Sequence, residues 1–330
     1  MSCLRIVTVR HALRRATKSA AKSLGMSQRG GFGMAAVGTI KIGGEIEVHR
    51  LGFGTMRLTG VGIWGPPDDP DECRATLRRA IELGVDFIDT ADSYGPYVAE
   101  ELVGEVLADG GGVHIATKAG LARVGPDVNG AGPRVWPPVG RPEFLRQECL
   151  MSLRRLNLDA IDLFQLHRID PKVPREDQFG VLKELQDEGK VRHVGLSQVS
   201  VTDIKSAREI VEVASVQNRY NLSDQSATEV LQYCEREGIA FIPWAPMAQG
   251  GLTGSDSRVA GIAEEHHVTP GAVALAWLLH RSEAMLPIPG TSKVSHLEEN
   301  MKAADLELTE DELTSLDDIV DTKAAGRPAR

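Results

Sequence analysis

The sequence predicts an α/β protein: a (β/α)8 TIM barrel with an N-terminal β-hairpin that closes the bottom of the barrel. Three observations favour this fold class. Eight short apolar segments have the composition of buried parallel strands, and amphipathic helical segments separate them. No glycine-rich turn after a strand has the G-x-G-x-x-G spacing of a dinucleotide fold, which disfavours the alternative, a doubly wound open sheet.

Composition and charge are those of an ordinary globular chain. The 330 residues are 42% hydrophobic and 25% charged, close to average usage. The formal charge of -9 disfavours binding to phosphate backbones or anionic lipid. The longest apolar stretches, such as residues 271–279, are far shorter than the ~20 residues that span a bilayer. We therefore expect neither a nucleic-acid nor a membrane partner.

The first 33 residues differ from the rest, because they carry seven basic residues and no acidic one. We expect residues 1–36 to form a disordered leader, residues 37–321 a single barrel and residues 322–330 a flexible tail. Three interpretations of the leader stay open: a disordered tail, a start codon misplaced upstream of Met26 or Met34, and a targeting signal.

The four cysteines lie far apart, and no two of them are separated by only two residues. Neither a zinc ribbon nor a thioredoxin-type motif is therefore present. The sequence also has no closely spaced cluster of metal ligands, so we expect no metal. Scattered thiols favour a reducing cytosol, and we expect a cytoplasmic protein.

The hairpin and the strands come first in the assignment of elements. TIKIGGEIEV, residues 39–48, predicts two short strands around the Gly43-Gly44 turn. The eight barrel strands are short and rich in β-branched residues, as expected of strands buried on both faces. They are residues 50–55, 85–90, 113–118, 160–167, 191–197, 214–218, 239–244 and 285–290.

Helices are predicted between these strands from apolar residues spaced three and four apart. Residues 70–84 illustrate the pattern, since Leu77, Ala80 and Ile81 form one apolar stripe and Gly84 ends it. The other predicted helices are residues 96–109, 141–157, 174–189, 201–212, 224–238 and 270–281.

Polar residues close several of the predicted strands, and in such a barrel the active site lies at the carboxyl ends of the strands. Singly, each has a structural explanation: Asp89 as an N-cap, Lys118 as a surface amine, His167 as a satisfied core histidine. Together they end three consecutive apolar strands, where ionisable groups are costly to bury unless they are paired. The full set is Asp89, Lys118, His167, Ser197, Gln198, Gln217, Asn218 and Trp244.

Tyr94 follows Asp89 by five residues, in the loop FIDTADSYG. A phenol with an ordinary pKa of ~10 needs ~4 kcal/mol of help to act as an acid at neutral pH. One positive charge at ~4 Å supplies about that much at an effective dielectric of ~20. We therefore expect the Lys118 ammonium to lower the pKa of Tyr94, and Asp89 to offset the cost of burying Lys118.

Six segments occur in a familiar order: FIDTADSYG, IATKAG, LFQLHRID, VGLSQVS, VQNRYN and LPIPGTSKVSHLEEN. They resemble the motifs of the aldo-keto reductase family across roughly residues 45–320. The resemblance implies a catalytic tetrad of Asp89, Tyr94, Lys118 and His167, with Tyr94 as proton donor and His167 orienting a carbonyl. It also implies hydride transfer from a nicotinamide cofactor across the barrel mouth, without a metal.

The same resemblance assigns cofactor contacts. Ser197 and Gln217 would hold the nicotinamide carboxamide, Gln198 stands where the family commonly has Asn, and Trp244 replaces a stacking Tyr. A helix starting at Ser295 and the turn before it would bind the adenosine end, and loop 248–254 would cover the pyrophosphate. NADPH is expected over NADH. The adenosine-end residues are Gly290, the phosphate ligands Thr291, Ser292 and Lys293, then His296 in place of the common Arg, and the adenine pair Glu299 and Asn300.

Residues 50–72 resemble the bacterial pyridoxal reductase-like subgroup, which implies a small aldehyde such as pyridoxal as substrate. We expect Met56, Trp64 and Trp136 to line the substrate pocket. Two other functions stay open. One is a nicotinamide-binding regulator resembling potassium-channel β subunits; the other is an isomerase or aldolase that uses Lys118 as a Schiff-base amine. No oligomeric state is predicted.

Overall fold

The computed structural model describes residues 34–108, 112–128, 132–247 and 257–319. The chain divides into units of residues 1–31 and 32–330, and every described residue belongs to the second unit. The predicted leader up to residue 33, the pyrophosphate loop 248–254 and the tail 322–330 lie outside the described residues. The described fold begins with the short 3-10 helix η1 (Met34–Val37), which buries Met34 and Val37 against the barrel helices.

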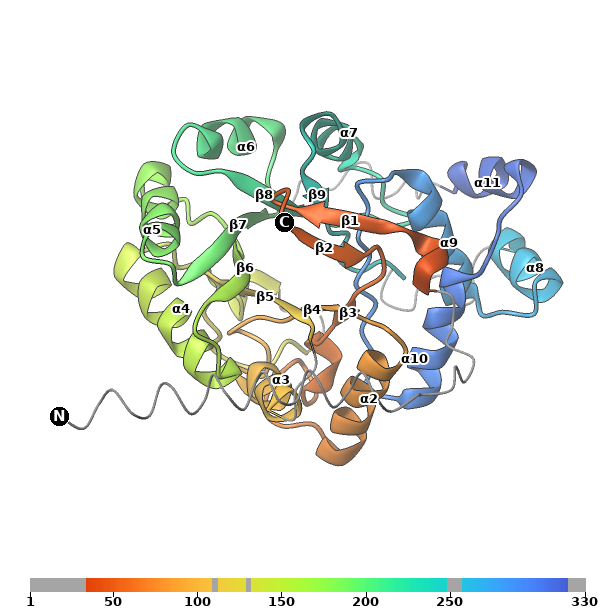
Figure 1. The fold of residues 1–330 in the computed structure, drawn as a ribbon, viewed down its shortest axis with the longest axis horizontal. Coiled ribbons are helices and arrows are strands. Elements are labelled where there is room, and N and C mark those ends of the chain that lie inside the picture. Colours follow the sequence, from red (N-terminus) through yellow and green to blue (C-terminus); the bar gives the residue numbers. More distant parts are fainter. Residues whose placement is uncertain (1–33, 109–111, 129–131, 248–256, 320–330) are drawn as a thin grey trace, which may run out of the picture. The chain divides into compact units, whose positions relative to one another are not determined.

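Within the described residues, seven parallel strands form a single sheet in chain order, from β3 to β9, and the sheet curls around one axis (Figure 1). Each strand overlaps one of the first seven predicted segments. The strands are β3 (Phe53–Gly54), β4 (Phe87–Asp89), β5 (His114–Ala119), β6 (Ile161–Leu166), β7 (Val191–Ser197), β8 (Val213–Gln217) and β9 (Ala240–Phe241).

Residues 285–290, the eighth predicted strand, close the barrel as an extended segment without regular strand pairing. One side of the segment bonds to β9, and on the other side Gly52 and Gly54 donate to the carbonyls of Pro287 and Pro289 at 3.0 and 3.2 Å. Proline has no N–H, so the segment cannot donate a full ladder of hydrogen bonds in return. The predicted closed (β/α)8 class is confirmed, with its last strand reduced by the two prolines.

Close packing of the backbone at this seam requires glycine. A side-chain carbon on Gly54 would lie 2.6 Å from the Ile288 carbonyl oxygen, and one on Gly290 would lie 2.4 Å from the Gly54 carbonyl oxygen. Any larger residue would push the two segments apart. The seam therefore joins tightly beside the mouth of the barrel.

Helices surround the sheet on its outside (Figure 1). The predicted helices appear as α2 (Pro70–Glu82), α3 (Val98–Leu107), α4 (Pro142–Leu156), α5 (Arg175–Asp187), α6 (Val201–Arg208), α7 (Thr228–Glu237) and α9 (Pro270–Arg281). Helix α10 (Val294–Met301) begins one residue before the predicted start, while α8 (Ser257–Glu265) and α11 (Glu310–Asp317) were not predicted. Short 3-10 turns are η2 (Met56–Leu58), η3 (Gly132–Arg134) and η5 (Lys302–Ala304). No helix in the described part of the chain has the length and apolar character needed to cross a membrane.

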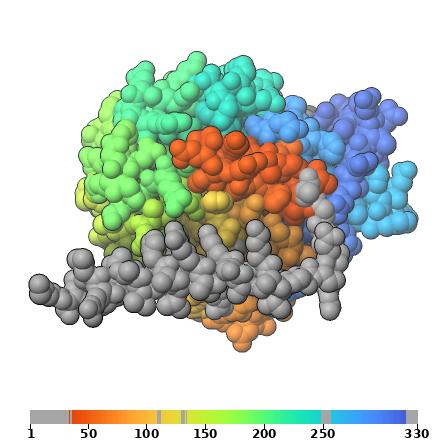
Figure 2. Space-filling view, viewed as in Figure 1, coloured from red at the N-terminus to blue at the C-terminus, as the bar shows by residue number. Residues whose placement is uncertain are grey.

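The N-terminal hairpin closes the amino-terminal end of the barrel, as predicted. Strands β1 (Thr39–Ile42) and β2 (Ile46–His49) pair antiparallel. Ile42, Ile46 and Val48 pack against inward side chains such as Phe87 and Leu163. Hairpin side chains fill the centre of this face (Figure 2). The opposite end, where the strands finish, is left as the mouth.

Candidate active site

Asp89 is the centre of a buried polar network inside the barrel. It ends β4, and its carboxylate accepts hydrogen bonds from three strands: from Lys118 Nζ at 2.5 Å, Gln165 Nε2 at 3.1 Å and Gln217 Nε2 at 2.9 Å. Lys118 and Asp89 are both essentially inaccessible to solvent. Burial of either charge is tolerable because the other charge lies against it.

Gln165 was missed in the sequence analysis. It lies on β6 two residues before His167, and alternate residues of a strand share one face. Its position on the inward face of the strand, rather than at the strand end, is the signal that identifies it.

Lys118 is held as an ammonium ion. Burial alone would lower the pKa of Lys118, but the Asp89 carboxylate and Tyr94 raise it above its ordinary value. The ammonium donates to Asp89 and, at 2.7 Å, to the Thr90 carbonyl. An amine that is buried, protonated and bonded in this way is not a nucleophile, so the Schiff-base alternative loses its reactive group.

Tyr94 lies in the loop after β4, 7% exposed, with Lys118 Nζ 5.1 Å from the centre of its ring. The expected lowering of its pKa is wrong. Burial raises the pKa of Tyr94 above its ordinary value, and the opposing effect of the Lys118 ammonium is smaller. The cost of burying a phenolate exceeds the gain from the nearby ammonium charge. The phenol is therefore protonated at neutral pH.

His167 follows β6 and faces Tyr94 edge-on, with ring centres 6.0 Å apart. Its Nδ1 lies 3.3 Å from Ser93 Oγ. Burial, together with Lys118 and two nearby arginines, holds the pKa of His167 well below its usual range. The imidazole is therefore neutral, with one nitrogen as donor and the other as acceptor.

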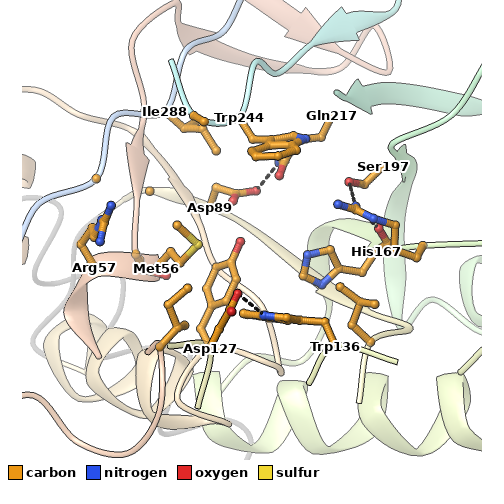
Figure 3. Close-up of a pocket in the computed structure, with 18 of the residues that line it drawn as sticks. Met56, Arg57, Asp89, Asp127, Trp136, His167, Ser197, Gln217, Trp244 and Ile288 are labelled. Atoms are coloured by element: carbon orange, nitrogen blue, oxygen red, sulfur yellow. Dashed lines mark hydrogen bonds between the residues drawn. The ribbon is translucent and has the colours of Figure 1, made fainter. Parts of the chain in front are cut away.

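A cavity of about 650 Å³ opens over Asp89, Tyr94 and His167 at the barrel mouth (Figure 3). Trp244 and Trp136 lie on opposite sides of it in this view. Trp136 is fixed by Asp127, whose carboxylate accepts from the indole Nε1 at 2.8 Å. The apolar part of the lining is Met56, Ile63, Leu121, Trp136, Pro138, Ile169, Trp244, Ala245, Pro246, Met247 and Ile288.

Of the three predicted substrate-pocket residues, Met56 and Trp136 line this cavity and Trp64 does not. Trp64 packs instead on Arg123, whose guanidinium lies 5.6 Å from the Trp64 ring centre and 3.6 Å from that of Trp136. Arg123 also donates to four backbone carbonyls, those of Gly62, Ile63, Ser93 and Gly125. It joins the pocket loops to the loop that carries Tyr94, a role that no motif in the sequence indicates.

The predicted nicotinamide contacts separate into two groups. Ser197, Gln217 and Trp244 line the cavity. Gln198 is not among the lining residues; it has a left-handed backbone, with φ 56°, and its Oε1 accepts from Trp244 Nε1 at 2.9 Å. Asn218, predicted as a polar strand-end residue but not as a cofactor contact, exchanges two hydrogen bonds with the Val199 backbone. Gln198 therefore orients the indole ring and Asn218 fixes the neighbouring loop.

A second cavity of about 810 Å³ adjoins the first and includes the predicted adenosine-end residues Gly290, Thr291, Ser292, Lys293 and His296. Met56, Arg57, Ile63, Asp127 and Gly290 line both cavities. These shared residues form the boundary between the two cavities.

Acidic groups also enter the second cavity, which the sequence analysis did not predict. Glu72 accepts from the Val294 N–H at 3.2 Å, so a carboxylate already uses one backbone donor at the start of α10. Glu299 forms an ion pair with Lys302 at 2.8 Å, and neither Glu299 nor Asn300 lines either cavity.

A phenol, an imidazole and the carboxylate of a buried ion pair line one pocket, an arrangement typical of an enzyme active site. Comparison identifies the family. A sequence model of the Aldo/keto reductase family matches residues 50–321. The chain therefore belongs to the aldo/keto reductase family and is an oxidoreductase.

Three known proteins illustrate the relationship. An uncharacterized oxidoreductase of Schizosaccharomyces pombe is 52% identical over 281 residues, covering 85% of this chain and 89% of the relative. Pyridoxine 4-dehydrogenase of Escherichia coli is 40% identical over 284 residues, covering 84% of this chain and 96% of the relative. The crystal structure of an aldo-keto reductase from Klebsiella pneumoniae in complex with NADPH has a TM-score of 0.71 and 25% identity, covering 88% of this chain and 96% of that one.

Proposed function

We propose that this protein reduces an aldehyde or ketone to the alcohol with NADPH, and that Tyr94 donates the proton. The observation that carries the proposal is the position of Tyr94. Its protonated phenol and the neutral His167 imidazole line one cavity, beside the buried Lys118 ammonium. A carbonyl oxygen placed in that cavity meets two neutral donors.

The residues at the barrel mouth fit a nicotinamide. Ser197 Oγ accepts from Arg168, so its own O–H remains to donate. Gln217 Nε2 donates to Asp89, so its Oε1 remains to accept. A carboxamide offers the matching acceptor and donors, and Trp244 offers a ring face for stacking. When bound, NADPH supplies the hydride. The NADPH complex of the Klebsiella relative supports this assignment.

The second cavity provides cations for the phosphates of the cofactor. We propose that Thr291, Ser292, Lys293 and His296 hold the 2′-phosphate beside the start of α10. Arg57 is exposed and lines both cavities. It is therefore our candidate for the pyrophosphate, a contact that no motif indicated.

The roles of the chain's own residues follow from their contacts. We propose that Ser93 donates to His167 Nδ1, which leaves Nε2–H to orient the substrate carbonyl. Tyr94 gives its proton to the developing alkoxide, and the Lys118 ammonium stabilises the phenolate that remains. Asp89 holds Lys118 in place. Because burial raises the pKa of Tyr94, reduction should be insensitive to pH from 6 to 9, while alcohol oxidation should rise towards alkaline pH.

For the substrate, we propose a small aromatic aldehyde such as pyridoxal. The apolar wall around Trp136 suits a flat ring, and the Escherichia coli relative is a pyridoxine 4-dehydrogenase. We also propose a reducing compartment such as the cytosol. Cys149 and Cys234 are buried free thiols, and burial raises the pKa of both to about 12, which keeps them unreactive.

The direct test is loss of NADPH absorbance with a panel of aldehydes that includes pyridoxal, comparing the parent with Tyr94→Phe. Loss of the proton donor should lower turnover by roughly 10²- to 10⁴-fold. Fluorescence titration with NADPH, and with NADH for comparison, measures cofactor binding. The substitution should leave NADPH binding unchanged. Equal turnover by both proteins contradicts the assignment of Tyr94. Tight NADPH binding without turnover of any aldehyde favours the regulatory alternative.

A further inference from the structure

Arg168 is a cation in the wall of the proposed substrate pocket that the functions described so far do not use. It directly follows His167 and lines the same cavity. Its Nη1 donates to the His167 carbonyl oxygen at 2.6 Å and to Ser197 Oγ at 2.9 Å. Burial lowers the pKa of Arg168 to about 10, so the guanidinium is still charged at neutral pH.

No carboxylate neutralises this charge within the described ranges. Arg50 and Arg155, two other guanidinium groups packed into the fold, each form an ion pair with a glutamate. Arg123 has no carboxylate bonded to it but saturates two nitrogens with four backbone carbonyls and stacks on Trp136. Arg168 bonds only through Nη1, to neutral oxygens, among the residues the structure places.

A partly buried guanidinium with an unused edge is costly unless an anion comes to it. Its planar fork fits two oxygens of a carboxylate, or one oxyanion, better than it fits any neutral group. His167 would hold the reacting carbonyl, and Arg168 lines the same cavity directly after it. An anionic group near that carbonyl would therefore lie close to Arg168. Asp127, a carboxylate in the same lining, is already bonded to Trp136 Nε1 and to the Gly132 N–H.

We propose that Arg168 is a specificity-determining residue that selects carbonyl substrates carrying an oxyanion, either a carboxylate or an ionised phenol, close to the reacting carbonyl. The inference rests on the proposed function, since it assigns a substrate class to the same pocket. An aromatic aldehyde with an ionised hydroxyl beside the formyl group meets this description, as does a formyl benzoate. The apolar wall around Trp136 and Ile63 would receive the ring.

The test compares matched charged and neutral aldehydes. One pair is 3-formylbenzoate and its methyl ester; the other is pyridoxal and its 3-O-methyl ether. In the parent, kcat/KM should favour the charged member of at least one pair by about 10-fold or more, and the favoured pair tells carboxylate from phenolate. Arg168→Met should abolish that preference, as expected for loss of a charge-assisted bidentate contact worth about 10-fold or more in kcat/KM. Arg168→Lys should keep part of it, because the charge remains without the fork.

Arg141→Met is the matched control, because Arg141 is an exposed arginine outside both cavities, 3.6 Å from Glu143. It should leave the preference and the turnover unchanged. Thermal unfolding of each variant checks that the barrel remains folded.

Binding of unreactive benzoate gives a readout that does not depend on turnover. Quenching of tryptophan fluorescence should report tighter binding of benzoate than of benzamide, and Arg168→Met should remove that difference. If no aldehyde is turned over, the proposed function fails while this measurement still tests Arg168. A parent without preference in either pair, or equal losses for charged and neutral members, overturns the proposal. A 10-fold rise in the Kd for NADPH with Arg168→Met also overturns it, because Arg168 would then serve the nicotinamide.

Discussion

Neighbouring residues of β5 enter two buried polar networks on opposite sides of the same sheet. Lys118 points into the barrel and bonds to Asp89. Thr117 points outwards, where its hydroxyl donates to Glu100 of α3 at 2.5 Å. Glu100 in turn accepts from Arg155 of α4, also at 2.5 Å. Strand alternation alone sends the two side chains to different environments.

The two networks differ in charge balance and in access. Inside the barrel, one ammonium faces one carboxylate, and the pair lies beside the groups that line the cavity. Outside the barrel, Arg155 forms ion pairs with both Glu100 and Glu148. The two carboxylates also raise the pKa of the buried Asp92, although burial has the larger effect. None of these outer groups lines either cavity. A buried ion pair takes part in catalysis only where reactive groups beside it line a pocket, whereas the outer network braces the sheet against two helices.

Breaking the inner pair, the ion pair between Lys118 and Asp89, should have the largest effect on stability and turnover. Lys118→Met leaves Asp89 as an unpaired buried carboxylate, which should cost about 3 kcal/mol of unfolding free energy. It also removes the charge that stabilises the Tyr94 phenolate, so NADPH-dependent turnover should fall on the order of 10³-fold. Urea unfolding and NADPH oxidation measure the two effects.

The double variant Asp89→Asn, Lys118→Met separates those effects, because it removes both charges together. It should recover most of the lost stability without recovering turnover. Recovery of turnover in the double variant would show that the inner pair only braces the barrel, as the outer network does.

Breaking the outer pair, the ion pair between Glu100 and Arg155, should lower stability without changing turnover. Glu100→Gln keeps the shape of the side chain but removes the main counter-charge of Arg155, so the unfolding free energy should fall by about 3 kcal/mol. Turnover per folded molecule should change by less than about threefold, because the network lines no cavity. Urea unfolding and turnover under native conditions test this, with the exposed neighbour Glu101→Gln as control. A loss of turnover without a loss of stability would erase the distinction between the networks.

The fold was predictable because periodicity and length identify strands and helices without knowledge of contacts. The limits came from local chemistry. Pro287 and Pro289 reduced the eighth strand to an extended segment, although the apolar pattern predicted a full strand. Helix α8 was missed because α9 already supplies the helix expected between β9 and residues 285–290, and α11 was missed because it follows the last strand segment.

The site was predictable as far as strand ends reveal it. Asp89, Lys118 and His167 come together because parallel strands finish at one edge of the sheet. Arg168 and Gln165 were missed, since one follows a strand end and the other precedes it. The pKa of Tyr94 is raised rather than lowered because the cost of burial depends on packing, which a sequence does not display. Trp64 is absent from the cavity lining because Arg123 holds it in the loops.

The outer network should also respond to pH. Burial is the main reason why the pKa of Asp92 lies well above its ordinary value, and the Glu100 and Glu148 carboxylates add to the shift. The folded protein therefore keeps this proton at pH values where the unfolded chain, with an aspartate pKa of ~3.9, has lost it. Stability from Asp92 is complete below about pH 4 and declines as pH rises towards the folded pKa, by about 1.4 kcal/mol per pH unit.

Asparagine has the shape of the protonated acid at every pH, so Asp92→Asn should become more stable relative to the parent as pH rises from 5 to 7. Urea unfolding at each pH measures the difference, and Asp177→Asn, which removes an exposed carboxylate of α5, should show no such trend. Parallel stability curves for Asp92→Asn and the parent would mean that Asp92 is ionised in the folded protein. The outer network would then place three carboxylates around one guanidinium, so its excess of negative charge, as well as its lack of access to a cavity, would distinguish it from the inner pair.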